Sequence, residues 1–244
     1  MSGEQLTHAA ARFAESVSRM VAARLGRHLV GVYIVGSAAL GDLQPTSDLD
    51  MAAVVDDAGA TPELDRLIGD VLGLAADAPV RGLEFVVYTA EQAARPDGSI
   101  TLNINAGPQM ETRLGSDADF WFAVDASILR ETAVALVGPP AAEVFGAVPH
   151  DALLDVLRRS LQWHRDHGDR PHANVLTACR AWRYAAEGVW SSKSAAGEWA
   201  AARAPDAGAL IDAAQAVRRG ESIQDVNTDD ARAFVERVRR VLAG

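Results

Sequence analysis

The sequence predicts an α/β domain followed by an all-α helical bundle, and three observations indicate this division. In the first 147 residues, short runs of β-branched and aromatic residues alternate with apolar residues at helical spacing. The pair Pro139-Pro140 follows the last strand-like run and begins a linker. After Pro149 the strand signals stop, and the remaining 95 residues have the pattern of four or five helices rich in Ala, Leu, Arg and Trp.

The positions of Gly, Pro and the apolar residues predict the order of the elements. We expect strands at 32–35, at 83–88, at 133–137 and through an acidic pair into 51–55, and a strand or extended segment in 101–110 that is broken at Gly107-Pro108. Helices are expected at 5–28, 61–75, 117–132, 151–167 and 171–187, and two more within 206–244. A turn is expected at 56–59, and Asp117 can cap the helix that it begins.

Composition limits the classes of function. With 244 residues, the chain has room for two domains, and 49% apolar with 23% charged residues is typical of a soluble globular protein. No apolar stretch reaches the roughly 18 residues of a membrane span, and the single cysteine, Cys179, excludes an internal disulfide. We therefore expect a cytoplasmic protein, a monomer, without a membrane partner. The net charge of −10 disfavours nucleic acid and favours a cationic small molecule.

The most informative stretch is 31–55, in which a strand ends at Gly36-Ser37 and the next strand begins at Asp48-Leu49-Asp50. Glycine lets the backbone approach a ligand, and serine offers a hydroxyl and an amide to a phosphate. Asp48 and Asp50 point to the same face of their strand, about 7 Å apart, and can share a divalent cation. Either motif alone is usually a turn or a surface feature. Together, in this order, they resemble the nucleotidyltransferase superfamily.

Glu84 is the one acid in the apolar run 83–88. A buried lone carboxylate is costly, so two interpretations stay open: a glutamate on an edge strand that faces water, or a third acid beside the strand of Asp48 and Asp50. In the second case, Glu84 is our candidate for the general base that takes the proton of an attacking hydroxyl. The run His164-Arg165-Asp166-His167-Gly168-Asp169 also contains metal-ligating residue types, but we expect it to be solvated.

A family resemblance extends over nearly the whole chain, from about Gly31 to Gly220. It is carried by the N-terminal motif, by the run 137–145 and by the segment from Asn174 to Trp199, which contains N-V-L-T-x-x-R-x-W and, thirteen residues after its Arg180, Lys193. These features resemble the aminoglycoside adenylyltransferases that modify streptomycin and spectinomycin. The resemblance implies a mixed-sheet nucleotidyltransferase domain at 1–147 and a helical domain at 148–244.

The resemblance also implies an activity and a set of roles. The chain would transfer AMP from ATP, with Mg²⁺, to a hydroxyl of spectinomycin or streptomycin, and so give antibiotic resistance. Asp48 and Asp50 match the magnesium ligands and Glu84 the catalytic base. Gly36, Ser37 and Ser47 match the phosphate-contacting turn and serines, and Arg180 and Lys193 match basic residues that hold the triphosphate across the domain cleft.

The chain departs from the family in the part that binds the drug. Streptomycin-modifying members have a tryptophan where this chain has 105–109, and an aspartate where it has Pro171; Asp169 and His172 lie close by and could substitute. Arg180 could instead form a salt bridge on a helix surface. Two other functions stay open: adenylyl transfer to another acceptor, a protein or a small molecule, and nucleotide binding without turnover.

Overall fold

The computed structural model describes residues 3–56, 61–116 and 119–243. Part of the turn expected at 56–59 and the expected cap Asp117 lie outside these ranges. The chain forms two compact units, one of Met1–Leu43 with Ser47–Val148 and the other of Gln44–Thr46 with Pro149–Gly244. No helix among the described residues is long and apolar enough to span a membrane.

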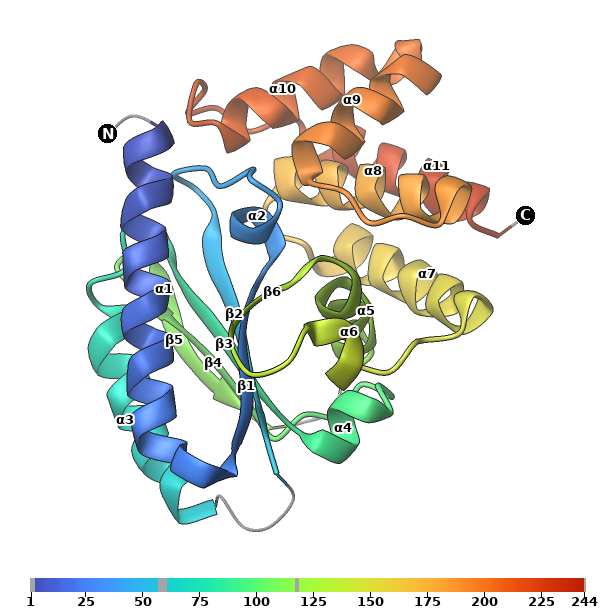
Figure 1. Ribbon diagram of the computed structural model, residues 1–244. Helices are drawn as coiled ribbons and strands as arrows, with labels where there is room; N and C mark the ends of the chain where they lie inside the picture. Colours follow the sequence, from blue (N-terminus) through green and yellow to red (C-terminus); the bar gives the residue numbers. More distant parts are fainter. Residues whose placement is uncertain (1–2, 57–60, 117–118, 244) are drawn as a thin grey trace. The chain divides into compact units, whose positions relative to one another are not determined.

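A mixed sheet forms the centre of the first unit, as the sequence predicts (Figure 1). Its strand order among the described residues is β5-β4-β3-β2-β1-β6, in which β2 and β3 are parallel and all other neighbours are antiparallel. The strands are β1 (Leu29–Val35), β2 (Asp48–Val55), β3 (Gly82–Thr89), β4 (Leu102–Gly107), β5 (Met110–Gly115) and β6 (Val134–Val137).

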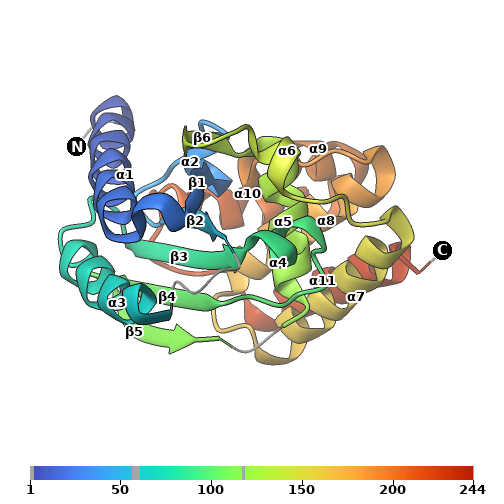
Figure 2. The ribbon, with the colours of Figure 1, turned by 60° about the horizontal axis from the view of Figure 1, so that its bottom comes forward.

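Helices cover both faces of this sheet (Figures 1 and 2). On one face, α1 (Gly3–Leu25) and α3 (Thr61–Ala75) pack on side chains that include Leu49 and Met51. On the other, α4 (Ala90–Ala94), α5 (Trp121–Thr132) and α6 (Ala141–Val144) pack on side chains that include Ala52 and Tyr88. Because strand side chains alternate between faces, Asp48 and Asp50 share the face of Ala52, which is the α5 face.

The sequence interpretation missed one strand. It expected a single strand or extended segment in 101–110, whereas β4 and β5 form a hairpin around Gly107 and Pro108. The segment Met110–Gly115 has no apolar alternation, and its side chains are mostly exposed at the sheet edge. Pairing with β4, rather than a local pattern, makes it a strand. In addition, α5 begins at Trp121, four residues later than expected.

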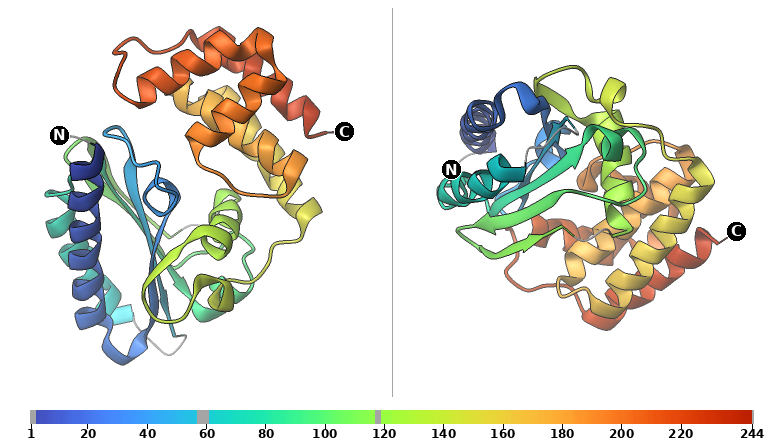
Figure 3. Two further views of the ribbon diagram at one scale, coloured as in Figure 1. Left: turned by 45° about the horizontal axis from the view of Figure 1, so that its top comes forward. Right: turned by 90° about the horizontal axis from the view of Figure 1, so that it is seen from below.

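The second unit is helical, as the sequence predicts, although no range was predicted for the helix Lys193–Arg203 (Figure 3). They are α7 (His150–His167), α8 (Pro171–Glu187), α9 (Lys193–Arg203), α10 (Gly208–Arg218) and α11 (Thr228–Val241). Helix α8 contacts the other four and buries residues around its circumference, among them Val175, Leu176 and Cys179. A helix that is apolar on most sides belongs in the middle of a bundle.

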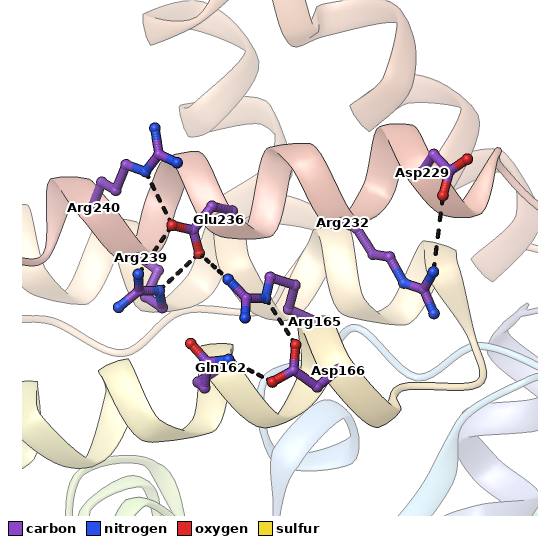
Figure 4. A network of polar contacts seen from close by, with 8 residues as sticks. All are labelled: Gln162, Arg165, Asp166, Asp229, Arg232, Glu236, Arg239 and Arg240. Carbon is purple, nitrogen blue, oxygen red and sulfur yellow. Dashed lines mark hydrogen bonds and ion pairs between the residues drawn. The ribbon is translucent and has the colours of Figure 1, made fainter.

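An ion network joins α7 to α11 (Figure 4). Glu236 accepts hydrogen bonds from Arg165 and Arg239, both at 2.8 Å, and from Arg240 at 3.0 Å. These bonds, that of Arg239 foremost, lower the pKa of Glu236 to about 2. Arg165 also donates to its neighbour Asp166, and through its bond to Glu236 this part of the run 164–169 takes part in helix packing. The network therefore stabilises the packing of α7 on α11. Its contribution to the free energy of unfolding is modest because the arginines are partly exposed.

Candidate functional site

The glycine turn lies where the sequence predicts it, between β1 and β2. Gly36 begins the short helix α2 (Gly36–Ala39) with a φ of +68°. A Cβ atom on Gly36 would lie 2.0 Å from the Asp50 Oδ2, so only glycine leaves room for that carboxylate. The Oγ of the next residue, Ser37, is buried and has no hydrogen-bond partner. The turn therefore packs directly against one of the two strand acids.

The parallel pairing of β2 and β3 brings Glu84 beside the two aspartates. Asp50 is the register partner of Glu84, which is in turn paired with Asn105 of β4. Glu84 therefore lies on an interior strand, and the interpretation as an edge-strand glutamate is wrong. It shares the α5 face with Asp48 and Asp50, so a carboxylate from a distant part of the sequence joins the two aspartates at one place on the sheet.

Arg81, just before β3, is a site residue that the sequence interpretation missed. Its guanidinium forms an ion pair with Asp48, with 2.5 Å between Nη2 and Oδ2, and both side chains are largely buried. Its backbone N–H donates to the carbonyl of Ser47 at 3.1 Å. The second oxygen of Asp48, Oδ1, is buried and has no partner. Arg81 thus holds one oxygen of Asp48 and leaves the other available to a cation.

The electrostatic environment makes Glu84 a stronger proton acceptor than an ordinary glutamate. Burial raises its pKa well above the usual value, and the charges of Asp50, Asp125 and Asp48 raise it further, while Arg81 opposes them. A raised pKa moves a carboxylate towards the range in which a general base works well. Asp125 was also missed; it is the one acid in the first two turns of the largely apolar α5, the same signal that drew attention to Glu84.

The basic residues of the helical unit also gather. The positive charges of Arg180 of α8 and of Lys193, the first residue of α9, both lower the pKa of His164 of α7. Burial first, and then the charges of Lys193, Arg180 and Arg170, lower the pKa of His164 to about 4, although its Nδ1 lies 3.1 Å from the Asn174 Oδ1. The Arg180 guanidinium lies over the Trp190 ring, 5.8 Å from its centre. This cluster can attract an anion such as a phosphate.

The two residues expected to replace the family's drug contacts differ in their surroundings. Asp169 is exposed in the connection between α7 and α8. His172 is held by Asp225: its backbone N–H donates to Oδ1 at 2.9 Å, and its Nδ1 lies 2.7 Å from Oδ2. Asp225 thus fixes the orientation of the His172 ring.

Comparisons with known proteins show which proteins this chain is similar to. Residues 143–243 match the family model for the C-terminal domain of aminoglycoside adenylyltransferases. An aminoglycoside (3'')(9) adenylyltransferase of Klebsiella pneumoniae is 31% identical over an alignment of 196 residues that covers 72% of either chain. A spectinomycin 9-adenylyltransferase of Staphylococcus aureus is 27% identical over an alignment of 211 residues that covers 80% of each chain. The crystal structure of a spectinomycin adenyltransferase from Enterococcus faecialis, with ATP and spectinomycin, matches with a TM-score of 0.78 at 18% identity, over 96% of this chain and 100% of that one.

Proposed function

Since the chain belongs to the aminoglycoside adenylyltransferase family and is a nucleotidyltransferase that uses ATP, we propose that it adenylylates a hydroxyl group of spectinomycin or streptomycin. Transfer of AMP would alter the drug and give resistance to it. The observation that supports this most is the register of β2 and β3, which sets Glu84 opposite Asp50 on the face that also carries Asp48. A general base and two metal ligands on one face are the groups that such a transfer requires.

In this proposal, Asp48 and Asp50 hold Mg²⁺. Carboxylate oxygens suit this ion, and the Oδ1 of Asp48, which is buried without a hydrogen-bond partner, fits the role of a ligand to it. In the described residues, no group of three or more His, Cys, Asp and Glu side chains is placed to hold a metal alone. Mg²⁺ is commonly bound by one or two carboxylates together with substrate phosphates and water. The ion would neutralise charge on the phosphate oxygens.

Glu84 takes the proton of the attacking hydroxyl. Its environment raises its pKa, chiefly through burial, so the carboxylate gains the proton more readily than a solvated glutamate does. Gly36 fixes the turn against Asp50, and Ser37 and Ser47 contact the phosphates. Arg180 and Lys193 bind the triphosphate, because their positive charges attract its negatively charged oxygens. Asp169 and His172 contribute to the acceptor site.

The test is a transfer assay with purified protein, ATP and MgCl₂, in which spectinomycin, streptomycin, a neutral sugar or a protein is the acceptor. We expect pyrophosphate release with spectinomycin, streptomycin or both, and mass spectrometry should find AMP on that drug. Tight ATP binding without release under any acceptor would contradict the proposal. Release with a protein acceptor alone would replace it with another kind of adenylyl transfer.

Glu84→Gln tests the role of the base within that assay. Its ATP affinity should stay near that of the wild type, while the transfer rate falls by roughly 10² to 10⁴, the usual contribution of a general base. Isothermal titration calorimetry with Mg-ATP measures the affinity. A large loss of ATP binding with a smaller effect on transfer would mean that Glu84 holds the nucleotide and is not the base.

A further inference from the structure

The short connection between α8 and α9 folds back onto α8 and buries a tryptophan. Helix α8 ends at Gly188, whose φ of +69° lies in the left-handed region, and Ser192 begins α9 by accepting a hydrogen bond from the N–H of Ala195 at 3.2 Å. Between these two ends, Trp190 is only 8% exposed. A buried indole ring removes a large apolar area from water, so Trp190 holds the connection against the helix.

The Trp190 ring contacts two residues of α8 that lie one helical turn apart. It stacks on the Tyr184 ring, with 4.2 Å between the ring centres and 22° between the ring planes. The guanidinium carbon of Arg180 lies over the same indole, 5.8 Å from its centre. Tyr184 is itself 6% exposed, and its ring lies 5.9 Å from that of His150 of α7. The indole is therefore held in place, and it offers the guanidinium a fixed aromatic surface.

The first turn of α9, which carries Lys193, is held by bonds that do not involve the indole ring. One is the N-cap hydrogen bond that begins the helix. Another joins α9 to α10, since Arg218 donates to the hydroxyl of Ser194 at 3.1 Å. Loss of the Trp190 ring should therefore leave Lys193 in place and act on phosphate binding through Arg180.

From these contacts we propose that Trp190 is a positioning residue for the triphosphate, because it holds the Arg180 guanidinium in the orientation in which it meets the phosphate oxygens. This inference rests on the proposed function, in which Arg180 binds the triphosphate. A planar guanidinium is attracted to an aromatic face and can still donate hydrogen bonds from its edge. An arginine that is already ordered loses less conformational freedom when it binds an anion. Trp190 itself touches neither the phosphates nor the acceptor.

Trp190→Leu keeps the connection apolar and removes the aromatic face. We expect its Kd for Mg-ATP to rise about 3- to 30-fold, the change that corresponds to a lost cation–π contact. AMP lacks the β- and γ-phosphates, so its Kd should stay that of the wild type. Trp190→Phe keeps a ring and should restore most of the affinity for Mg-ATP. Calorimetry without an acceptor measures the Kd of Mg-ATP, and AMP is titrated in competition with it.

Two further variants show whether Trp190 acts through Arg180. In Arg180→Met the cation is absent, so the addition of Trp190→Leu should cause no further loss of Mg-ATP affinity. Trp199→Leu is the matched control. Trp199 of α9 packs edge-on against Trp182 at 5.3 Å, and the Arg203 guanidinium lies 3.9 Å from its ring centre. Because this arginine has no proposed role in nucleotide binding, the control should bind Mg-ATP with the Kd of the wild type.

Several results would overturn the inference: wild-type affinity for Mg-ATP in Trp190→Leu or in Arg180→Met, an equal loss for Mg-ATP and AMP, or the same loss from Trp190→Leu with and without Arg180. If fluorimetry finds Trp190→Leu unfolded, Trp190→Phe takes its place in the comparison with Arg180→Met. These affinities are measured without turnover. Failure of the inference is therefore distinguished from failure of the proposed function, which appears as a wild type that binds Mg-ATP but releases no pyrophosphate with any acceptor.

Discussion

Replacing Gly36 with alanine should show how strongly the transfer rate depends on the position of the Asp50 carboxylate, apart from any change in the stability of the fold. A Cβ atom at this position would lie 2.0 Å from the Asp50 Oδ2, whereas real Cβ contacts are essentially never under 3.0 Å. The carboxylate must therefore move by about 1 Å. Because it is the end of a flexible side chain, this movement costs little folding free energy, yet it displaces a proposed metal ligand.

The expected magnitudes follow from that displacement. A 1 Å error in the position of a catalytic group can reduce the rate by roughly 10²-fold, and we expect this loss of kcat in Gly36→Ala. The backbone contributes a separate effect, since the φ of +68° is strained for alanine by about 1–3 kcal/mol. For a chain of this length, each kcal/mol lowers the melting temperature by roughly 2–4 °C.

Gly41→Ala is the matched control. Gly41 has a φ of +67° and no heavy atom within 4 Å of its ideal Cβ position, so this variant carries the backbone strain without the clash. Pyrophosphate release and differential scanning fluorimetry should find equal melting temperatures for the two variants and a large loss of activity only in Gly36→Ala. If both variants retain activity, Asp50 does not need the position that the structure gives it.

Two further predictions concern stability. Arg81→Met leaves Asp48 without its 2.5 Å partner and should lower the free energy of unfolding by about 3 kcal/mol; fluorimetry should find part of the loss restored by MgCl₂, and no magnesium effect would contradict the metal role of Asp48. In the folded protein the pKa of His164 is about 4, below its ordinary 6.5. The contribution of neutral His164 to the free energy of unfolding is therefore fully present above pH 6.5 and is lost as the pH falls towards 4. The loss is on the order of 3 kcal/mol. Urea unfolding at several pH values in this range measures the free energy of unfolding, which should depend less on pH in His164→Gln than in the wild type. An equal pH dependence in the two proteins would refute the lowered pKa of His164.

Much of the local structure could be predicted because its signals lie within a few residues. The strand that ends at Gly36-Ser37, the acidic strand of Asp48 and Asp50, and the boundaries of α8 follow from composition and periodicity. The order of most elements and the division into a mixed α/β part and a helical part were predicted for the same reason, although no range was predicted for α4, α6 or α9. The strand β5 was not, because its sequence is polar and its conformation depends on its pairing with β4.

The sequence by itself determined which residue types were available: a glycine turn, two aspartates on one strand and a glutamate in an apolar run. Only the tertiary structure decided which of them meet. The parallel register sets Glu84 opposite Asp50, Arg81 reaches Asp48 from the start of the neighbouring strand, and α5 brings Asp125 to the same face. Strand order and helix packing arise from long-range burial of apolar faces, and spacing along the chain carries little information about such contacts.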